Sequence, residues 1–197
     1  MRGALIAFEG LDQSGKQTQT DALIAALTAA GHKCERLSFP DYSTAIGTEI
    51  HKALHGERDY APDVMQLLYV ANRYEFRTRL ETWIADGRII VCDRYKASSI
   101  AYGQAQGVDA AWLSEIQRFL PAADLTILLD IPPKVAVDRK ATNRDRYERD
   151  LDLLTRVRSS YRTQSSDPGW ALIPADRAKA DVTAAVLETV QSRLGLL

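Results

Sequence analysis

Cysteine is scarce in this sequence. Among 197 residues only Cys34 and Cys92 are cysteines, and both lie in short apolar runs typical of β-strands. A disulfide framework or a cysteine-based metal site uses more cysteines at closer spacing. We therefore expect two reduced core cysteines in a cytoplasmic protein.

The chain also lacks an excess of one charge and any long apolar run. Its 25 Lys and Arg residues balance 26 Asp and Glu residues, which gives no general attraction for nucleic acid or an anionic membrane. The apolar run Ala4–Phe8 is too short for a signal peptide or a membrane span. Without repeats or low-complexity linkers, residues 1–197 are expected to form one soluble domain with neither nucleic acid nor membrane as partner.

Short apolar runs bounded by Gly, Pro or Asp recur along the chain, with helix-length segments between them. The runs are Ala4–Phe8, Glu35–Phe39, Ile89–Cys92, Leu125–Ile131 and Trp170–Ile173. This pattern predicts an α/β fold with five parallel strands and helices on both faces. Apolar periodicity predicts helices over Gln19–Ala30, Asp63–Ile84 and Ala178–Leu194. The second should place on one apolar face Val64, Leu67, Leu68, Ala71, Leu80, Trp83 and Ile84. Gly31 and Gly87 are expected to end the first two helices.

A glycine-rich loop follows the first predicted strand. It reads Gly10-Leu11-Asp12-Gln13-Ser14-Gly15-Lys16-Gln17-Thr18. Its two glycines and lysine match the phosphate-binding P-loop, in which backbone N–H groups and a helix N-terminus surround phosphates. An ordinary turn would have no need for a lysine at this offset, so we interpret the loop as the site of ATP.

The P-loop departs from its usual pattern at Gln17. A Ser or Thr that ligates Mg²⁺ normally follows the lysine, whereas the threonine here comes one position later, at Thr18. Gln17 would reach Mg²⁺ through its amide oxygen or through water. Thr18 is left as a candidate phosphate contact.

Asp93 and Arg94 directly follow the third predicted strand. Ligands of open parallel sheets bind at the carboxyl ends of the strands. Asp93 therefore suits Mg²⁺ or a metal-bound water, and Arg94 suits a phosphate. The alternative is an ion pair that caps the strand.

Aromatic and polar side chains share helix faces at two further places. Tyr69 and Arg73 lie four residues apart, as do Ser98 and Tyr102. A ring beside a guanidinium can stack on a base and donate to its carbonyl. A tyrosine at the edge of the core with a solvated arginine is the alternative.

Together these motifs resemble those of the thymidylate kinases, over nearly the whole chain. The most specific are Phe8-Glu9-Gly10-Leu11-Asp12, Ala71-Asn72-Arg73 and Asp93-Arg94-Tyr95; the others are Phe39-Pro40, Leu67–Arg73, Ser98 with Tyr102, and Arg146-Tyr147-Glu148. The resemblance implies a three-layer P-loop kinase fold with a short lid and a homodimer. It implies transfer of the γ-phosphoryl of ATP to dTMP, with Mg²⁺, in dTTP synthesis.

The resemblance also implies roles for individual residues. Asp12 would lie near the sugar 3′-hydroxyl, and Arg94 would hold the acceptor phosphate. Tyr69 would stack on thymine while Arg73 donates to its carbonyl. Tyr102 would occupy the space of a ribose 2′-hydroxyl. The remaining acceptor residues implied are Phe39, Pro40, Ser98 and Ser99, and the remaining ATP residues are Arg139 and Arg177.

The sequence departs from the family pattern at two places, the contact to the acceptor phosphate and the loop that contacts adenine. Asp41 and Tyr42 follow Pro40 where members often carry an arginine, and the adenine loop reads Pro174-Ala175-Asp176-Arg177 in place of the usual Asp-Ala. Rival interpretations are another P-loop nucleotide or nucleoside kinase and an inactive nucleotide-binding paralogue. A regulatory GTPase would need an Asn-Lys-x-Asp motif, which the sequence lacks.

The source of the catalytic cation is predicted to be a basic lid. Gln13 gives the P-loop no extra charge, whereas residues 138–150 carry five Arg or Lys residues. We expect this lid, residues 139–149, to supply Arg144 and Arg146; the alternative is a solvated charged loop. Replacing either by alanine should lower kcat by roughly 10²-fold with little change in the KM for dTMP. Steady-state kinetics would contradict the prediction if both variants turned over like the wild type.

Overall fold

The computed structural model describes residues 2–139 and 150–197. Its sheet has five strands, all paired in parallel, in the order β2-β3-β1-β4-β5. They are β1 (Ala4–Glu9), β2 (Cys34–Ser38), β3 (Ile89–Asp93), β4 (Leu125–Asp130) and β5 (Trp170–Pro174). The prediction of five parallel strands is confirmed, because each strand begins and ends within one residue of its predicted bounds.

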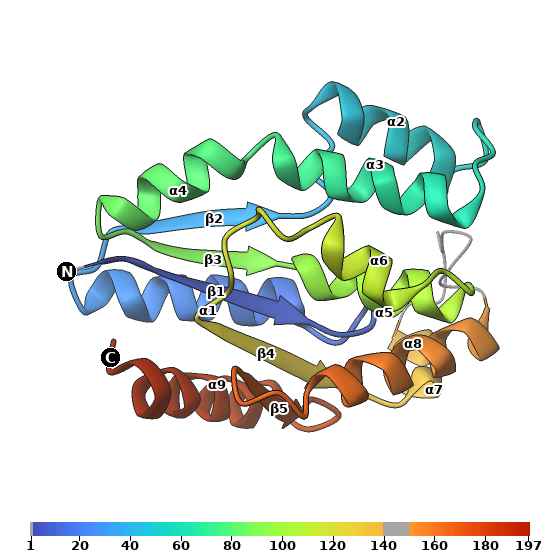
Figure 1. Cartoon of the computed structure of the whole chain (residues 1–197). Helices are drawn as coiled ribbons and strands as arrows, with labels where there is room; N and C mark the ends of the chain where they lie inside the picture. The colour runs from blue at the N-terminus through green and yellow to red at the C-terminus, as the bar shows by residue number, and fades with distance from the viewer. Residues whose placement is uncertain (1, 140–149) are drawn as a thin grey trace.

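Helices alternate with these strands along the chain (Figure 1). They are α1 (Lys16–Ala29), α2 (Ala45–Leu54), α3 (Pro62–Tyr74), α4 (Arg77–Ala85), α5 (Lys96–Ala105), α6 (Ala110–Glu115), α7 (Pro133–Arg139), α8 (Leu151–Gln164) and α9 (Lys179–Leu194). Gly31 and Gly87 follow α1 and α4 with φ of 91° and 77°, the left-handed conformation that ends a helix. Both predicted helix stops are confirmed.

The core lies on both faces of the sheet, because successive residues of a strand point in opposite directions. On one face Ile6, Phe8, Ile89 and Val91 share a cluster with Leu23 and Leu27 of α1 and with Val182 and Val186 of α9. On the other, Leu5, Ala7, Ile90 and Cys92 share a cluster with Leu80 and Ile84 of α4. The predicted three-layer architecture is thus confirmed.

The prediction of one continuous helix over Asp63–Ile84 is wrong. The chain turns at Glu75 and Phe76, between α3 and α4. Phe76 is buried and packs edge-on against Phe39, with ring centroids 5.4 Å apart. The turn lets α4 cover the sheet, while α3 lies on the side of the strands' carboxyl ends (Figure 1).

The predicted apolar face of this segment is also wrong in part over α3, where Leu68 packs against the core but two other members do not. Val64 and Leu67, assigned to the buried face with Leu68, Ala71, Leu80, Trp83 and Ile84, are exposed. The buried residues of α3 are Met65, Gln66, Val70, Asn72 and Arg73. The inner face of α3 is therefore mixed: Met65 belongs to the hydrophobic core, whereas the polar Gln66 and Arg73 line a pocket.

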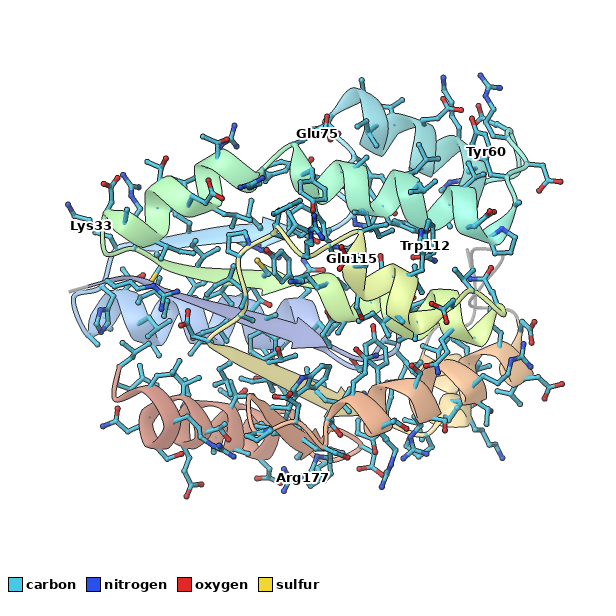
Figure 2. The ribbon with its side chains drawn as sticks, in the orientation of Figure 1. Lys33, Tyr60, Glu75, Trp112, Glu115 and Arg177 are labelled. Atoms are coloured by element: carbon cyan, nitrogen blue, oxygen red, sulfur yellow. The ribbon has the colours of Figure 1, made fainter. Side chains whose placement is uncertain are left out.

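All five strands run in the same direction, so their carboxyl ends meet at one edge of the sheet (Figure 1). Lys33, just before β2, marks the opposite edge (Figure 2). The segments that follow β1, β2 and β3 carry all the predicted acceptor residues and the P-loop, while Arg139 and Arg177 follow β4 and β5. Within the two described ranges, no helix combines the length and apolarity needed to cross a bilayer.

Candidate active site

The P-loop connects β1 to α1 with the backbone that its glycines permit. Gly10 has a φ of 138°, and a Cβ there would lie 2.5 Å from the carbonyl oxygen of Leu129. Gly15, at the N-terminus of α1, has a φ of 94°. At Gly10 a side chain would clash with the backbone of the neighbouring segment. At both Gly10 and Gly15 the positive φ disfavours any residue other than glycine. The loop therefore has the strand-loop-helix setting that anion binding requires.

Lys16 lies inside the P-loop and is only 6% exposed. Its ammonium donates to the carbonyl oxygen of Leu11 at 2.8 Å and lies 4.0 Å from the Asp12 carboxylate. Burial lowers the pKa of Lys16, and the nearby Arg94 lowers it further, while Asp12 opposes both. Because the buried ammonium has lost hydration and is repelled by Arg94, it has a strong electrostatic preference for an anionic ligand.

A polar pocket of about 850 Å³ opens above the loop. Its lining residues are Asp12, Gln13, Gly15, Lys16, Gln17, Thr18, Ser38, Phe39, Pro40, Tyr42, Asp93 and Arg94. The pocket brings Asp93 together with the P-loop, as the sequence predicts. Gly10, Leu11 and Ser14 form the loop without lining this pocket.

The donor atoms in this pocket fit Mg²⁺ held mainly by phosphate oxygens. The described residues contain no cluster of three or more His, Cys, Asp or Glu side chains that would enclose a metal ion. Mg²⁺ commonly keeps several waters and binds through one or two carboxylates plus substrate phosphates. Asp93 offers one such carboxylate, and Gln17 and Thr18 offer neutral oxygens.

Arg94 connects the phosphate pocket to a second pocket. Its Nη2 donates to Asp12 Oδ1 at 2.7 Å and to the Tyr102 hydroxyl at 3.3 Å. Its Nη1 donates to the Ser98 hydroxyl and the Tyr161 hydroxyl, both at 3.2 Å. Burial, the largest single influence, lowers the pKa of Arg94, but the combined effect of Asp12, Tyr102, Tyr161 and Asp93 more than reverses this and raises it. The guanidinium is therefore a fixed positive charge.

Behind Arg94 lies a buried carboxylate that the sequence reasoning assigned no role. Glu9, at the end of β1, is fully buried and accepts from the backbone N–H groups of Tyr95 and Ser98. It also accepts from the hydroxyls of Ser98 at 2.6 Å and Tyr161 at 2.9 Å. Glu9 thus satisfies the N-terminus of α5 and fixes two of the hydroxyls that contact Arg94.

Glu9 and Tyr161 differ in how clearly the sequence indicates a role in the site. Glu9 could have been singled out from the sequence, because it is an acidic residue at the end of an apolar strand. Tyr161 gave no local signal, because it meets Glu9 from 152 residues away, on α8.

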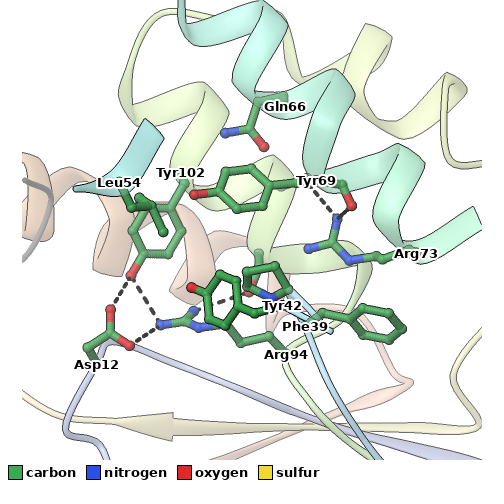
Figure 3. Close-up of a pocket in the computed structure, with 12 residues that line it drawn as sticks. Asp12, Phe39, Tyr42, Leu54, Gln66, Tyr69, Arg73, Arg94 and Tyr102 are labelled. Atoms are coloured by element: carbon green, nitrogen blue, oxygen red, sulfur yellow. Dashed lines mark hydrogen bonds and ion pairs between the residues drawn. The ribbon is translucent and has the colours of Figure 1, made fainter. Parts of the chain in front are cut away.

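The second pocket has a volume of about 520 Å³ and lies between α3, α5 and the segment after β2 (Figure 3). It contains every residue predicted to hold the acceptor: Asp12, Phe39, Pro40, Tyr69, Arg73, Arg94, Ser98, Ser99 and Tyr102. Three further residues line this pocket and were not predicted from the sequence: Tyr42, Leu54 and Gln66. Asp12, Phe39, Pro40, Tyr42 and Arg94 line both pockets, so ligands in the two would be adjacent.

Arg73 is a buried cation at the inner end of this second pocket. Its Nη1 donates to the Ser99 hydroxyl at 2.7 Å and to the Tyr69 carbonyl at 3.3 Å. Burial is the main cause that lowers the pKa of Arg73. Its Nε has no partner among the described residues. The arrangement presents an N–H donor to a ligand that carries a carbonyl oxygen.

The structure places the outer ATP residues in part. Arg139 donates to the carbonyl oxygens of Gln13 at 3.1 Å and Ala175 at 3.0 Å, which links the P-loop to the predicted adenine loop. Arg177 is exposed and donates to the Pro174 carbonyl at 3.0 Å. Arg144, Arg146 and the predicted lid, apart from Arg139, lie outside the described residues.

A phosphate loop at the carboxyl edge of a parallel sheet, with a second pocket that shares its arginine, defines the class of P-loop phosphotransferases. The sequence model for thymidylate kinase matches residues 8–186. The chain is 35% identical to a thymidylate kinase of Arabidopsis thaliana over 189 residues, which cover 96% of this chain and 71% of the relative. It is 37% identical to a human thymidylate kinase over 148 residues, 75% of this chain and 70% of the relative.

A solved structure agrees with these relatives. Thymidylate kinase from Candida albicans superposes with a TM-score of 0.85 and 28% identity, covering 100% of this chain and 94% of the other. The chain belongs to the thymidylate kinase family.

Proposed function

We propose that the chain transfers the γ-phosphoryl of ATP to dTMP, giving ADP and dTDP in the supply of dTTP. The observation that carries this proposal is the pair of adjacent pockets that share Asp12 and Arg94. The P-loop pocket suits a triphosphate, and the second suits a nucleoside monophosphate whose phosphate points toward Arg94. Family membership supports the identity of both substrates.

No protein nucleophile is required for this reaction, because the acceptor phosphate attacks the γ-phosphoryl in line. Arg94 would hold the attacking phosphate, and Asp12 would fix Arg94 and approach the sugar 3′-hydroxyl. Lys16 would contact the transferred phosphoryl. Mg²⁺, when bound, would neutralise charge on the phosphate oxygens, with Asp93 as its protein ligand or the acceptor of a metal-bound water.

The base and sugar contacts follow from the same pocket. Tyr69 would stack on thymine and Arg73 would donate to a carbonyl of the base, with Phe39, Pro40 and Ser99 around it. Ser98 lines the pocket, but its hydroxyl already bonds to Glu9, which supports a role in positioning. Tyr102, whose hydroxyl accepts from Arg94, would occupy the space that a ribose 2′-hydroxyl needs.

An acceptor panel with ATP and Mg²⁺ tests the proposal most directly. It would compare dTMP, dUMP, dCMP, dGMP, dAMP and thymidine in a coupled assay of ADP release. dTMP should be among the best acceptors. A panel in which another nucleotide or thymidine was clearly preferred, or in which no acceptor reacted, would contradict it.

Tyr69→Ala should raise the KM for dTMP about 10-fold or more, because stacking of a base on an aromatic ring contributes roughly 1–3 kcal/mol. Tyr69→Phe is the matched control, since it keeps the ring and should stay close to wild type. Steady-state kinetics with ATP saturating would measure both. Equal KM values in the two variants would remove Tyr69 from the base site.

We also propose a single domain with a lid at residues 139–149, a cytoplasmic location and a homodimer. Exposed Val64 and Leu67 on α3 support a dimer, since apolar side chains on one helix face favour association. The free cysteines Cys34 and Cys92 are compatible with a reducing compartment. Light scattering of the purified chain would give its oligomeric state.

A further inference from the structure

Gln66 is a fully buried polar residue of α3 that lines the acceptor pocket. Neither its amide oxygen Oε1 nor its amide nitrogen Nε2 has a hydrogen-bond partner among the described residues. Buried amides are ordinarily hydrogen-bonded, because an unpaired one loses its contacts with water and gains nothing in return. A Gln66 amide that faces a ligand pocket is therefore a candidate ligand contact.

The stem of Gln66 is held in place by its neighbours. A Cβ at Gly103 of α5 would lie 3.1 Å from Gln66 Cγ, so the two helices approach closely here. Figure 3 shows the amide beside the rings of Tyr69 and Tyr102, on the pocket side of α3. Gln66, Tyr69 and Arg73 follow one another at intervals of three and four residues, and so share one face of the helix.

Gln66 gives this helix face a hydrogen-bond acceptor that Arg73 cannot provide. Arg73 can only donate hydrogen bonds, and its guanidinium is matched to carbonyl oxygens. The base of a pyrimidine-2,4-dione also carries a ring N–H between its two carbonyls, which needs an acceptor. Ser99 already accepts from Arg73, and the Asp12 carboxylate accepts from Arg94. The amide of Gln66 offers both an acceptor and a donor, the complement of an N–H beside a carbonyl.

We propose that Gln66 reads the imide edge of the acceptor base, with Oε1 accepting from the ring N3–H and Nε2 donating to an adjacent carbonyl. This inference rests on the proposed function, because it names how that site selects a pyrimidine-2,4-dione. Arg73 and Gln66 together would then reject cytosine, whose N3 lacks a hydrogen and whose exocyclic amine would face the donor-only Arg73.

Gln117 provides a matched control within the same protein. It is also fully buried, and its Oε1 has no partner among the described residues. Its Nε2 donates to the carbonyl oxygens of Leu113 and Lys96, and it does not line the acceptor pocket. Gln117→Leu therefore removes a buried amide without touching the acceptor.

The experiment measures KM and kcat for dTMP, dUMP and N3-methyl-dTMP in wild type, Gln66→Leu and Gln117→Leu. Gln66→Leu should raise the KM for dTMP and dUMP alike by about 10-fold, the expected effect of losing one or two hydrogen bonds, with kcat and the KM for ATP nearly unchanged. Its KM for N3-methyl-dTMP should rise less, since that ligand keeps its carbonyls but lacks the N–H. Gln117→Leu should leave every KM at the wild-type value.

Stability separates recognition from a structural role. Without ligand, Gln66→Leu should melt at or above the wild-type temperature, because leucine removes an unpaired polar group from a buried site. An unchanged KM for dTMP in Gln66→Leu, or an equal rise for N3-methyl-dTMP, would overturn the inference. If Gln66→Leu did not fold, Gln66→Met would replace it. Wild-type enzyme that used N3-methyl-dTMP and dTMP equally well would also overturn the inference.

These outcomes are distinct from failure of the proposed function. A wild-type enzyme that did not phosphorylate dTMP would contradict the proposed function. A wild-type enzyme that did so, with a Gln66→Leu variant of unchanged KM, would contradict only the role of Gln66.

Discussion

Lys16→Met should lower kcat by about 10³-fold while the fold remains intact, an effect typical of removing one preorganised charge from a transition state. Lys16 is buried within hydrogen-bond distance of the Leu11 carbonyl, in the wall of the phosphate pocket. Methionine fills a similar volume without the charge. Single-turnover kinetics with ATP and dTMP would measure the loss in the chemical step.

The same variant should keep or raise its melting temperature in the absence of nucleotide. Burial lowers the pKa of Lys16, which means that the folded state disfavours the charged form that the unfolded chain carries at neutral pH. Removing the amine removes that penalty. The rise in melting temperature produced by ATP should shrink, because part of the attraction for phosphate is lost.

Lys33→Met is the control for this experiment. Lys33 is exposed at the opposite edge of the sheet from the P-loop (Figure 2). Its replacement should change neither kcat nor the response to ATP. If Lys16→Met retained more than about a tenth of wild-type turnover, the P-loop assignment of the catalytic cation would fail.

The strands could be predicted because each one is a buried apolar run with punctuating residues at both ends. The break between α3 and α4 could not, since nothing between Asp63 and Ile84 interrupts helical propensity. It depends on Phe76 fitting against Phe39, a contact between segments distant in sequence. Likewise, Val64 and Leu67 are exposed although apolar residues are expected inside, and part of the buried face of α3 is taken by Gln66 and Arg73, which line the acceptor pocket.

The site was predictable where a residue follows a strand or belongs to a motif. The P-loop, Asp93 and Arg94 meet because the strands are parallel and their carboxyl ends share one edge. Residues that support the site from behind gave weaker signals. Tyr161 reaches Glu9 and Arg94 only once α8 packs against α5, and Gln66 is indistinguishable by sequence from any helical glutamine.

Arg94→Met should lower kcat/KM for dTMP by about 10³-fold, because the guanidinium is the fixed cation shared by the two pockets. Arg94→Lys should lose about 10²-fold, since lysine keeps a charge but not the planar fork that contacts Asp12, Ser98, Tyr102 and Tyr161 at once. Arg94 has a φ of 66°, and lysine or methionine is no more strained there than arginine. Backbone conformation therefore does not confound the comparison.

The expected order of activity, wild type above Arg94→Lys above Arg94→Met, distinguishes phosphate binding from a structural ion pair. The Asp12 side chain is 36% exposed, so water can solvate its carboxylate when Arg94 is gone, and the melting temperature should change little. Arg36→Met, which breaks an exposed ion pair with Asp21, should leave kcat/KM at the wild-type value. Variants of Arg94 that lost stability but kept kcat/KM for dTMP would show that the arginine holds Asp12 and the end of β3 in place, and that another group binds the acceptor phosphate.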